Sequence, residues 1–184
     1  MTSTSLRVCP VELSGGLDNR LRRWLQNPDK ILGPYVFAGM TALEVGCGPG
    51  FFTPTLAALV GPAGRIIACD LQEGMLQKLE AKIAGSELAA RITLHNCQAD
   101  RLGVTDPIDF ALLFYMLHEV PDQKRLLTEV AALLTPGGRL LLVEPPFHVS
   151  KTAFTSSLEL AEAAGLRVIS RPRITFSKAA LLGR

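Results

Sequence analysis

Two carboxylates and a glycine-rich turn are the residues whose types and spacing indicate a binding site. Glu44 stands two residues before the segment GCGPG, and Asp70 ends a later apolar run, RIIACD. Glycine has no Cβ and adopts left-handed backbone conformations at little cost, so a ligand can lie directly against such a turn. A negative charge at Glu44 is poorly suited to a pyrophosphate. It is well suited to a ligand that carries positive charge.

The turn also departs from the dinucleotide-binding fingerprint, which reads G-x-G-x-x-G. In this chain the three glycines alternate as G-x-G-x-G, and Phe51 stands where the fingerprint has its last glycine. Asp70 alone does not decide the ligand, because an acid in that position also binds the ribose of NAD. Glu44 and Phe51 therefore disfavour an NAD-linked reductase, which stays an alternative.

Short apolar runs that alternate with amphipathic segments are expected to position these residues. TALEV, RIIACD, RITLH, IDFALLF and RLLLVE have the length and composition of strands. EGMLQKLEAKI and DQKRLLTEVAALL each place their apolar residues on one helical stripe. Asp122 is placed to cap the second of these helices, and TPGG stops it. Strands that alternate with helices predict an α/β doubly wound sheet with helices on both faces.

The C-terminal segment predicts an antiparallel end to this sheet. SKTAFTSSLELAEAAG is expected to form a helix that Ser150 caps and Gly165 closes. LRVIS and ITFSKAALL follow, separated only by RPR. So short a link permits a hairpin but no crossover helix. We therefore expect a mixed sheet whose last strand is antiparallel.

Composition and charge favour a single globular domain. The chain has 184 residues, 48% of them apolar, and a net charge of +2 without a basic block. The N-terminus lacks the apolar core of a signal peptide, and no segment approaches the roughly 18 apolar residues of a membrane span. We expect a cytoplasmic protein with no membrane or nucleic-acid partner. Residues 1–30 are expected to form an N-terminal helical lid, and residues 31–184 the binding domain.

The four cysteines indicate neither a disulfide framework nor a metal centre. Cys9, Cys47, Cys69 and Cys97 are far apart and form no C-x-x-C pair. Cys47 lies inside the glycine turn, so it is expected near the ligand, and its small size also explains its presence there. The role of Cys9, in the expected lid, stays open.

The segment LEVGCGPGFFT resembles the first motif of class I S-adenosylmethionine-dependent methyltransferases of the small-molecule type, whose pattern is acid-x-G-x-G-x-G. Their cofactor carries an ammonium and a sulfonium, which accounts for the acid. IDFALLFYMLHEVPD looks like the family's fourth-strand motif, and LLTPGGRLLLVEP like its next turn and fifth strand. The resemblance covers about residues 31–184. It implies a Rossmann-like, seven-stranded sheet and S-adenosylmethionine as the cofactor.

The resemblance also implies a set of cofactor contacts. Asp70 matches the acid that binds both ribose hydroxyls. Gln98 replaces the family's adenine-binding acid and Ala99 matches its small residue, while Asp100 is the other candidate for the acid. Tyr35 is expected to close over the methionine end, with a packing role as the alternative. The cofactor-binding residues expected in all are Tyr35, Glu44, Gly46, Cys47, Gly48, Gly50, Asp70, Leu71, Gln98, Ala99 and Phe114.

Methyl transfer from this cofactor depends mainly on how the acceptor is positioned. A base is needed only when the acceptor arrives protonated, as a phenol or an alcohol does. His118 is the candidate base, with Glu119 to orient it. The alternative is that both side chains face solvent or cap a helix.

The expected function is methyl transfer by in-line displacement to a small, partly apolar acceptor. The apolar segment FYML, the expected lid and the lack of an RNA-binding insertion favour such an acceptor over a nucleic acid. The alternative is an adaptor protein that binds S-adenosylmethionine without turnover. The sequence leaves open the acceptor and the choice between a monomer and a homodimer.

Overall fold

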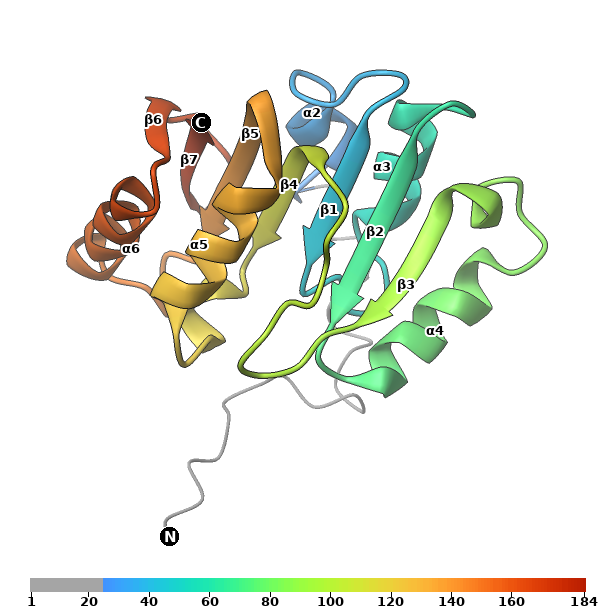
Figure 1. The fold of residues 1–184 in the computed structure, drawn as a ribbon, viewed down its shortest axis with the longest axis horizontal. Helices are drawn as coiled ribbons and strands as arrows, with labels where there is room; N and C mark the ends of the chain where they lie inside the picture. Colours follow the sequence, from blue (N-terminus) through green and yellow to red (C-terminus); the bar gives the residue numbers. More distant parts are fainter. Residues whose placement is uncertain (1–24) are drawn as a thin grey trace, which may run out of the picture.

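The computed structural model describes residues 25–184, in which seven strands form one sheet with helices packed on its two faces (Figure 1). The strands are β1 (Thr41–Val45), β2 (Arg65–Asp70), β3 (Ile92–Asn96), β4 (Ile108–Phe114), β5 (Leu134–Glu144), β6 (Arg167–Ser170) and β7 (Lys178–Gly183). The helices are α2 (Pro28–Leu32), α3 (Thr53–Val60), α4 (Glu73–Ile83), α5 (Gln123–Leu133) and α6 (Lys151–Ala163). Two short 3-10 turns are η2 (Ala89–Arg91) and η3 (Leu117–Glu119).

The strand order is β3-β2-β1-β4-β5-β7-β6. β1 to β5 pair in parallel, and β7 runs antiparallel to both β5 and β6. The predicted doubly wound, Rossmann-like mixed sheet with its antiparallel last strand is therefore confirmed.

β7 starts later than the apolar run ITFSKAALL suggested, because a turn at residues 174–177 interrupts that run. Phe176 has a φ of 51° there, and Ser177 N–H donates to the Ile174 carbonyl at 3.1 Å.

The sheet has one apolar core on each face. Helices α2, α3 and α4 cover one face, and α5 and α6 cover the other (Figure 1). Successive residues of β1 point to opposite cores: Leu43 and Val45 pack with α5 and α6, whereas Ala42 packs with α3. The link between β3 and β4 has no helix, and Leu102 fills part of the α5 face in its place.

Two helix starts follow the sequence-based prediction. Asp122 Oδ1 accepts the N–H of Arg125 at 2.9 Å, which caps α5. Ser150 Oγ accepts the N–H of Ala153 at 3.0 Å, which caps α6. Each bond satisfies an N–H group that the helix itself cannot pair.

The chain reverses direction across the sheet between β1 and β4. After β1 it moves to β2 and then β3, and after β3 it crosses back to β4 on the other side of β1. Parallel strands on both sides of such a switch point leave a crevice beyond their C-terminal ends. Glu44, Asp70, Phe114 and Glu144 all lie at or next to those ends.

Most of the expected N-terminal lid, including Cys9, lies outside the described residues. Within residues 25–184, no helix has the length and apolar character that crossing a bilayer requires.

The packing of α4 against the GCGPG turn requires a glycine at position 50. The φ of Gly50 is +82°, and a Cβ built on it would collide with Leu79 Cδ1 of α4. Substituting alanine there would both strain the backbone and force the neighbouring side chain to move. Gly85, with a φ of +72° and nothing within 4 Å of such a Cβ, offers a matched comparison.

We predict that Gly50→Ala destabilises the fold more than Gly85→Ala does. Left-handed strain costs each variant about 1–2 kcal/mol, and overpacking against Leu79 costs Gly50→Ala about 1–3 kcal/mol more. The free energy of unfolding in urea measures both. Equal losses in the two variants would contradict the packing role of Gly50.

Candidate functional site

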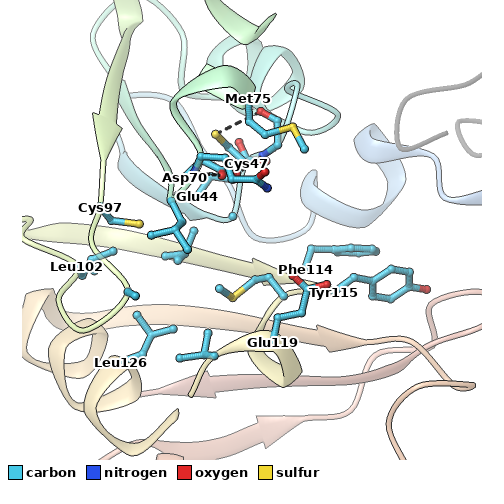
Figure 2. A pocket seen from close by; sticks show the side chains of 18 of the residues that line it. Glu44, Cys47, Asp70, Met75, Cys97, Leu102, Phe114, Tyr115, Glu119 and Leu126 are labelled. Carbon is cyan, nitrogen blue, oxygen red and sulfur yellow. Dashed lines mark hydrogen bonds between the residues drawn. The ribbon is translucent and has the colours of Figure 1, made fainter. Parts of the chain in front are cut away.

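A cavity of about 560 Å³ lies beyond the C-terminal ends of β1, β2 and β4 (Figure 2). Its walls come from the GCGPG turn, the end of β2, the link after β3, the segment after β4 and the first turns of α5. Small-molecule sites commonly have volumes of about 300–1,000 Å³ and favour the switch point of an α/β sheet. Position and size therefore make this cavity the candidate site.

Asp70 ties the end of β2 to the glycine turn. Its Oδ2 accepts the N–H of Gly48 at 2.8 Å, and its Oδ1 accepts the N–H of Gln72 at 2.9 Å. Asn96 Nδ2 donates to the carbonyls of Asp70 and Leu71, both at 3.1 Å. Burial raises the pKa of the Asp70 carboxyl, while the backbone hydrogen bonds act in the opposite direction. The carboxylate is held in one position before any ligand arrives.

Glu44 is the second buried carboxylate of the cavity wall. Only 3% of the residue is exposed, and its Oε2 accepts a hydrogen bond from Thr53 Oγ1 at 2.7 Å. Thr53 is the first residue of α3, so the pair joins the end of β1 to the start of the helix across the turn. The acid predicted from the sequence therefore lies on the cavity wall.

The other two glycines of the turn are needed for different reasons. Gly48 has a φ of +54°, and a Cβ built on it would meet nothing within 4 Å. Because Gly48 lines the cavity, its backbone is open to close approach by a ligand. Gly46 has a φ of +69°, and a Cβ there would lie 3.0 Å from Met116 Cβ.

The link after β3 forms a tight turn at one end of the cavity. Gln98 N–H donates to the Arg101 carbonyl at 2.9 Å, and Arg101 N–H donates back at 3.3 Å. This turn brings Gln98, Ala99 and Asp100 to the cavity wall together. Both candidates for the adenine contact are thus in place, and the choice between Gln98 and Asp100 stays a prediction.

Aromatic rings line the side of the cavity near β4. Phe51 and Phe52 meet edge to face with centroids 4.8 Å apart, and Phe52 lies 4.4 Å from Phe114. Tyr115 continues the series 4.5 Å from Phe114. Tyr115 has a φ of 59°, and its hydroxyl lies 2.6 Å from Ser177 Oγ. The series gives this side of the cavity an apolar surface.

The structure brings together nine of the eleven predicted cofactor residues. The nine that line the cavity are Glu44, Gly46, Cys47, Gly48, Asp70, Leu71, Gln98, Ala99 and Phe114. Tyr35 lines a separate hollow beside α2, and Gly50 packs against α4 instead of facing the cavity. Phe52, Met75 and Leu126 also line the cavity and were not predicted. Met75 and Leu126 belong to the apolar stripes of their helices, and a stripe alone does not show which of its members reaches a ligand.

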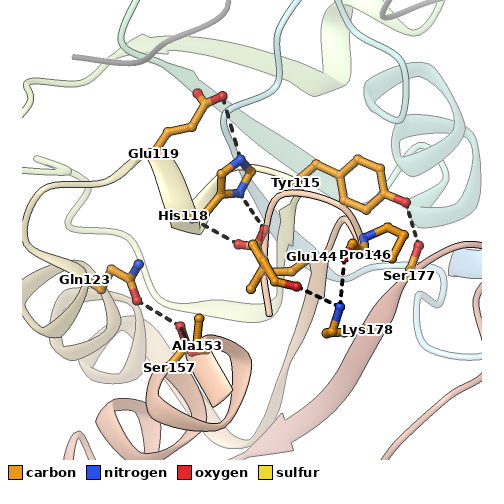
Figure 3. Close-up of polar contacts among 11 residues, drawn as sticks. Tyr115, His118, Glu119, Gln123, Glu144, Pro146, Ala153, Ser157, Ser177 and Lys178 are labelled. Carbon is orange, nitrogen blue, oxygen red and sulfur yellow. Dashed lines mark hydrogen bonds and ion pairs between the residues drawn. The ribbon is translucent and has the colours of Figure 1, made fainter. Parts of the chain in front are cut away.

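His118 lies behind the cavity wall, and its partner differs from the one expected. Its Nδ1 lies 2.6 Å from Glu144 Oε2, and its backbone N–H donates to Glu144 Oε1 at 3.1 Å (Figure 3). Glu144, not Glu119, orients the ring, because β5 lies next to β4 in the sheet and Glu144 ends β5. Glu119 lines the cavity, whereas His118 is not among its lining residues. The hydrogen bond to Glu144 raises the pKa of His118.

The described cysteines are free thiols held in their neutral form. Burial raises the pKa of Cys47 and of Cys69 far above the usual range, and that of Cys97 to about 11. Cys47 and Cys97 line the cavity as small apolar groups. Among the residues that the structure describes, no three His, Cys, Asp or Glu side chains are arranged to hold a metal ion.

Comparison with known proteins identifies the family. A family model described as a methyltransferase domain matches residues 42–138. The chain belongs to this methyltransferase family. A crystal structure of an S-adenosylmethionine-dependent methyltransferase from Aquifex aeolicus superposes with a TM-score of 0.82 at 25% identity, and covers 95% of this chain and 99% of that one. The sequence-based assignment to the class I family, with its fold and its cofactor, S-adenosylmethionine, is confirmed.

Several proteins that are similar in sequence are named as methyltransferases, whereas one protein that is similar in fold is named as a cyclase. A demethylmenaquinone methyltransferase of Lactobacillus johnsonii is 36% identical over 110 residues, 59% of this chain and 45% of that protein. The chain spans about half the length of the curated relatives it matches. The [4+2]-cyclase SpnF shares the fold, with a TM-score of 0.68 at 21% identity over 80% of this chain and 60% of that one.

The residues of the cavity fit S-adenosylmethionine. Gly48 leaves the backbone bare where a nucleoside would lie, and two fixed carboxylates face a cavity of about 560 Å³. Buried carboxylates suit both ribose hydroxyls, which donate hydrogen bonds, and the ammonium and sulfonium charges.

The His118–Glu144 contact makes a prediction about stability and pH. Because folding raises the pKa of His118, its contribution is fully present below the unfolded pKa of about 6.5. That contribution is lost as the pH rises through the higher folded value. Urea unfolding from pH 5.5 to 9 should therefore show His118→Gln less stable than the parent at low pH, with a gap that narrows at high pH. A gap independent of pH would contradict this, and Glu144→Gln should remove the same pH dependence.

Proposed function

We propose that this methyltransferase transfers the methyl group of S-adenosylmethionine to a small, partly apolar acceptor. The observation that carries the proposal is the bare Gly48 backbone between two fixed carboxylates at the switch point. When bound, S-adenosylmethionine supplies a methyl group on a positively charged sulfur, which an attacking nucleophile can displace without further activation.

Each wall of the cavity has a task in this proposal. Asp70 would hold the ribose hydroxyls, and the turn at Gln98–Arg101 would border the adenine. Glu44 would offset the positive charge near the glycine turn. The rings of Phe52, Phe114 and Tyr115 would exclude water and hold the acceptor, which is what the reaction requires of the protein.

The acceptor side of the cavity favours an apolar molecule. Beyond the aromatic series, Met116, Val120 and Leu126 line the cavity. Relatives named as demethylmenaquinone methyltransferases support an aromatic, hydroxyl-bearing acceptor. A reduced demethylmenaquinone is therefore the first acceptor to test, and related quinols and phenols of the same size are the next.

We predict that Asp70→Asn weakens binding of S-adenosylhomocysteine by about 10- to 100-fold, because a charge-assisted hydrogen bond contributes about 1.5–3 kcal/mol. Isothermal titration calorimetry measures the change. Asp109→Asn is the matched control: Asp109 also accepts two hydrogen bonds, from Thr41 and Thr135, but does not line the cavity. Equal weakening by both variants would place the effect in the fold and not in the site.

The proposed reaction itself is tested with radiolabelled S-adenosylmethionine. The purified 184-residue chain is incubated with reduced demethylmenaquinone, and in parallel with a metabolite extract from which the labelled product is identified. We expect label in an apolar small molecule. Binding by calorimetry without any transfer would favour the adaptor protein that is the alternative function.

A further inference from the structure

Glu119 differs from most of the other acids that line the cavity. Four of those acids accept hydrogen bonds within the chain: Glu44, Asp70, Asp122 and Glu129. Asp100 is exposed, at the tip of the turn near the expected adenine end. Glu119 has 29% of its side chain exposed, and its Oε1 lies 4.0 Å from Nε2 of His118. That separation is too long for a hydrogen bond, so the carboxylate keeps its capacity to accept one.

The position of Glu119 places it on the acceptor side. Asp70 ends β2, whereas Glu119 ends η3, which follows β4. Figure 2 shows Glu119 beside Phe114 and Tyr115, on the wall that faces Asp70 and Glu44. The carboxylate thus stands next to the apolar surface where the acceptor is expected, and away from the residues expected to hold the nucleoside.

Two further side chains lie in series behind Glu119. Glu144, which is 1% exposed, binds both the ring and the backbone N–H of His118. With Nδ1 engaged in this way, the other ring nitrogen, Nε2, faces Glu119 (Figure 3). A buried carboxylate, an imidazole and a cavity carboxylate therefore form one series from β5 to the cavity wall.

We propose that Glu119 is the general base that removes a proton from the acceptor, and that His118 and Glu144 are the residues that position it. This inference rests on the proposed function. It reverses the roles expected from the sequence, where His118 was the candidate base and Glu119 its orienting partner.

The electrostatic surroundings of Glu119 suit this task. Burial raises the pKa of its carboxyl, and the negative charges of Glu144 and Asp70 raise it further. His118 and His148 act in the opposite direction. A carboxylate whose pKa is moved toward the working pH is a stronger base than an exposed one.

The step balances with one proton and one methyl group. Glu119 takes a hydroxyl proton from the acceptor, which frees an electron pair on the acceptor. On an alcohol or phenol that is methylated at oxygen, this pair forms the bond to the methyl carbon directly. On reduced demethylmenaquinone the pair is delocalised into the ring, a ring carbon forms the bond to the methyl carbon, and that carbon then loses its hydrogen as a proton while the oxygen regains one. In both cases the pair of the broken carbon–sulfur bond stays on sulfur. The protonated Glu119 then releases its proton to solvent, with which its side chain is in contact.

The experiment compares the parent chain with Glu119→Gln, His118→Gln and the control Glu159→Gln, which lies on the exposed face of α6. The turnover number for reduced demethylmenaquinone, or for the acceptor found in the extract, is measured from pH 5.5 to 9. The parent should lose activity as the pH falls through the raised pKa of Glu119. Glu119→Gln should lack this acid limb and be slower by about 100-fold at neutral pH.

His118→Gln separates a positioning role from a purely structural one. Because the His118 charge lowers the pKa of Glu119, its removal should move the acid limb to higher pH while the limb persists. Glu159→Gln should follow the parent at every pH.

A second readout does not depend on turnover. In chains labelled with ¹³C at the glutamate carboxyls, one carboxyl should titrate above the usual value of about 4.3 and disappear in Glu119→Gln. Calorimetry with S-adenosylhomocysteine should show equal affinity for the parent and Glu119→Gln, because Glu119 serves the acceptor and not the nucleoside.

The outcomes separate this inference from the proposed function. A parent chain that binds no S-adenosylhomocysteine, or that transfers no label, overturns the proposed function and the inference with it. A parent that transfers label while Glu119→Gln stays within about threefold of it across the pH range overturns the inference alone, since loss of a general base costs far more. The same holds if Glu119 titrates at the usual carboxyl value.

Discussion

The hydrogen bond from the Gly48 N–H to the Asp70 carboxylate is the contact on which the site depends. It joins the turn after β1 to the end of β2, and the second oxygen of Asp70 holds Gln72 at the start of α4. A carboxylate that is buried needs such donors, because burial without hydrogen bonds is costly. The geometry that satisfies Asp70 also leaves the Gly48 backbone bare toward the cavity. Stability of the fold and readiness for a ligand therefore come from one interaction.

A buried acid with a hydrogen-bond partner also stands at the ends of two other strands. Glu44 at the end of β1 is paired with Thr53, and Glu144 at the end of β5 is paired with His118. Each acid is almost fully buried and joins its strand to the segment that borders the cavity. Removing one partner of such a pair costs more than the pair contributes, because it leaves a buried charge without a partner. The cavity walls are thus rigid at the carboxyl ends of these strands.

The two sides of the cavity have different tasks in the proposed function. The side formed by the glycine turn, β2 and the link after β3 carries the residues that match the methyltransferase family. The side formed after β4 and by α5 carries the aromatic and apolar residues together with Glu119, Asp122 and Glu129. A structure of the same fold is named as a cyclase, so the fold alone does not determine the reaction. The acceptor side is where this chain's own chemistry is decided.

The sequence by itself determined the fold class, the order of its elements, the helix caps at Asp122 and Ser150, and the family with its cofactor. These are local or periodic properties: apolar runs, turn residues and a motif within a dozen positions each indicate structure where they stand. Only the tertiary structure decided which side chains meet. His118 and Glu144 are 26 positions apart, and they come together because β5 pairs with β4. Gly50 and Tyr35 were expected to bind the cofactor, yet they do not line the cavity. Gly50 packs against α4, and Tyr35 lies beside α2. Side-chain direction depends on packing between distant segments, and spacing along the chain does not encode it.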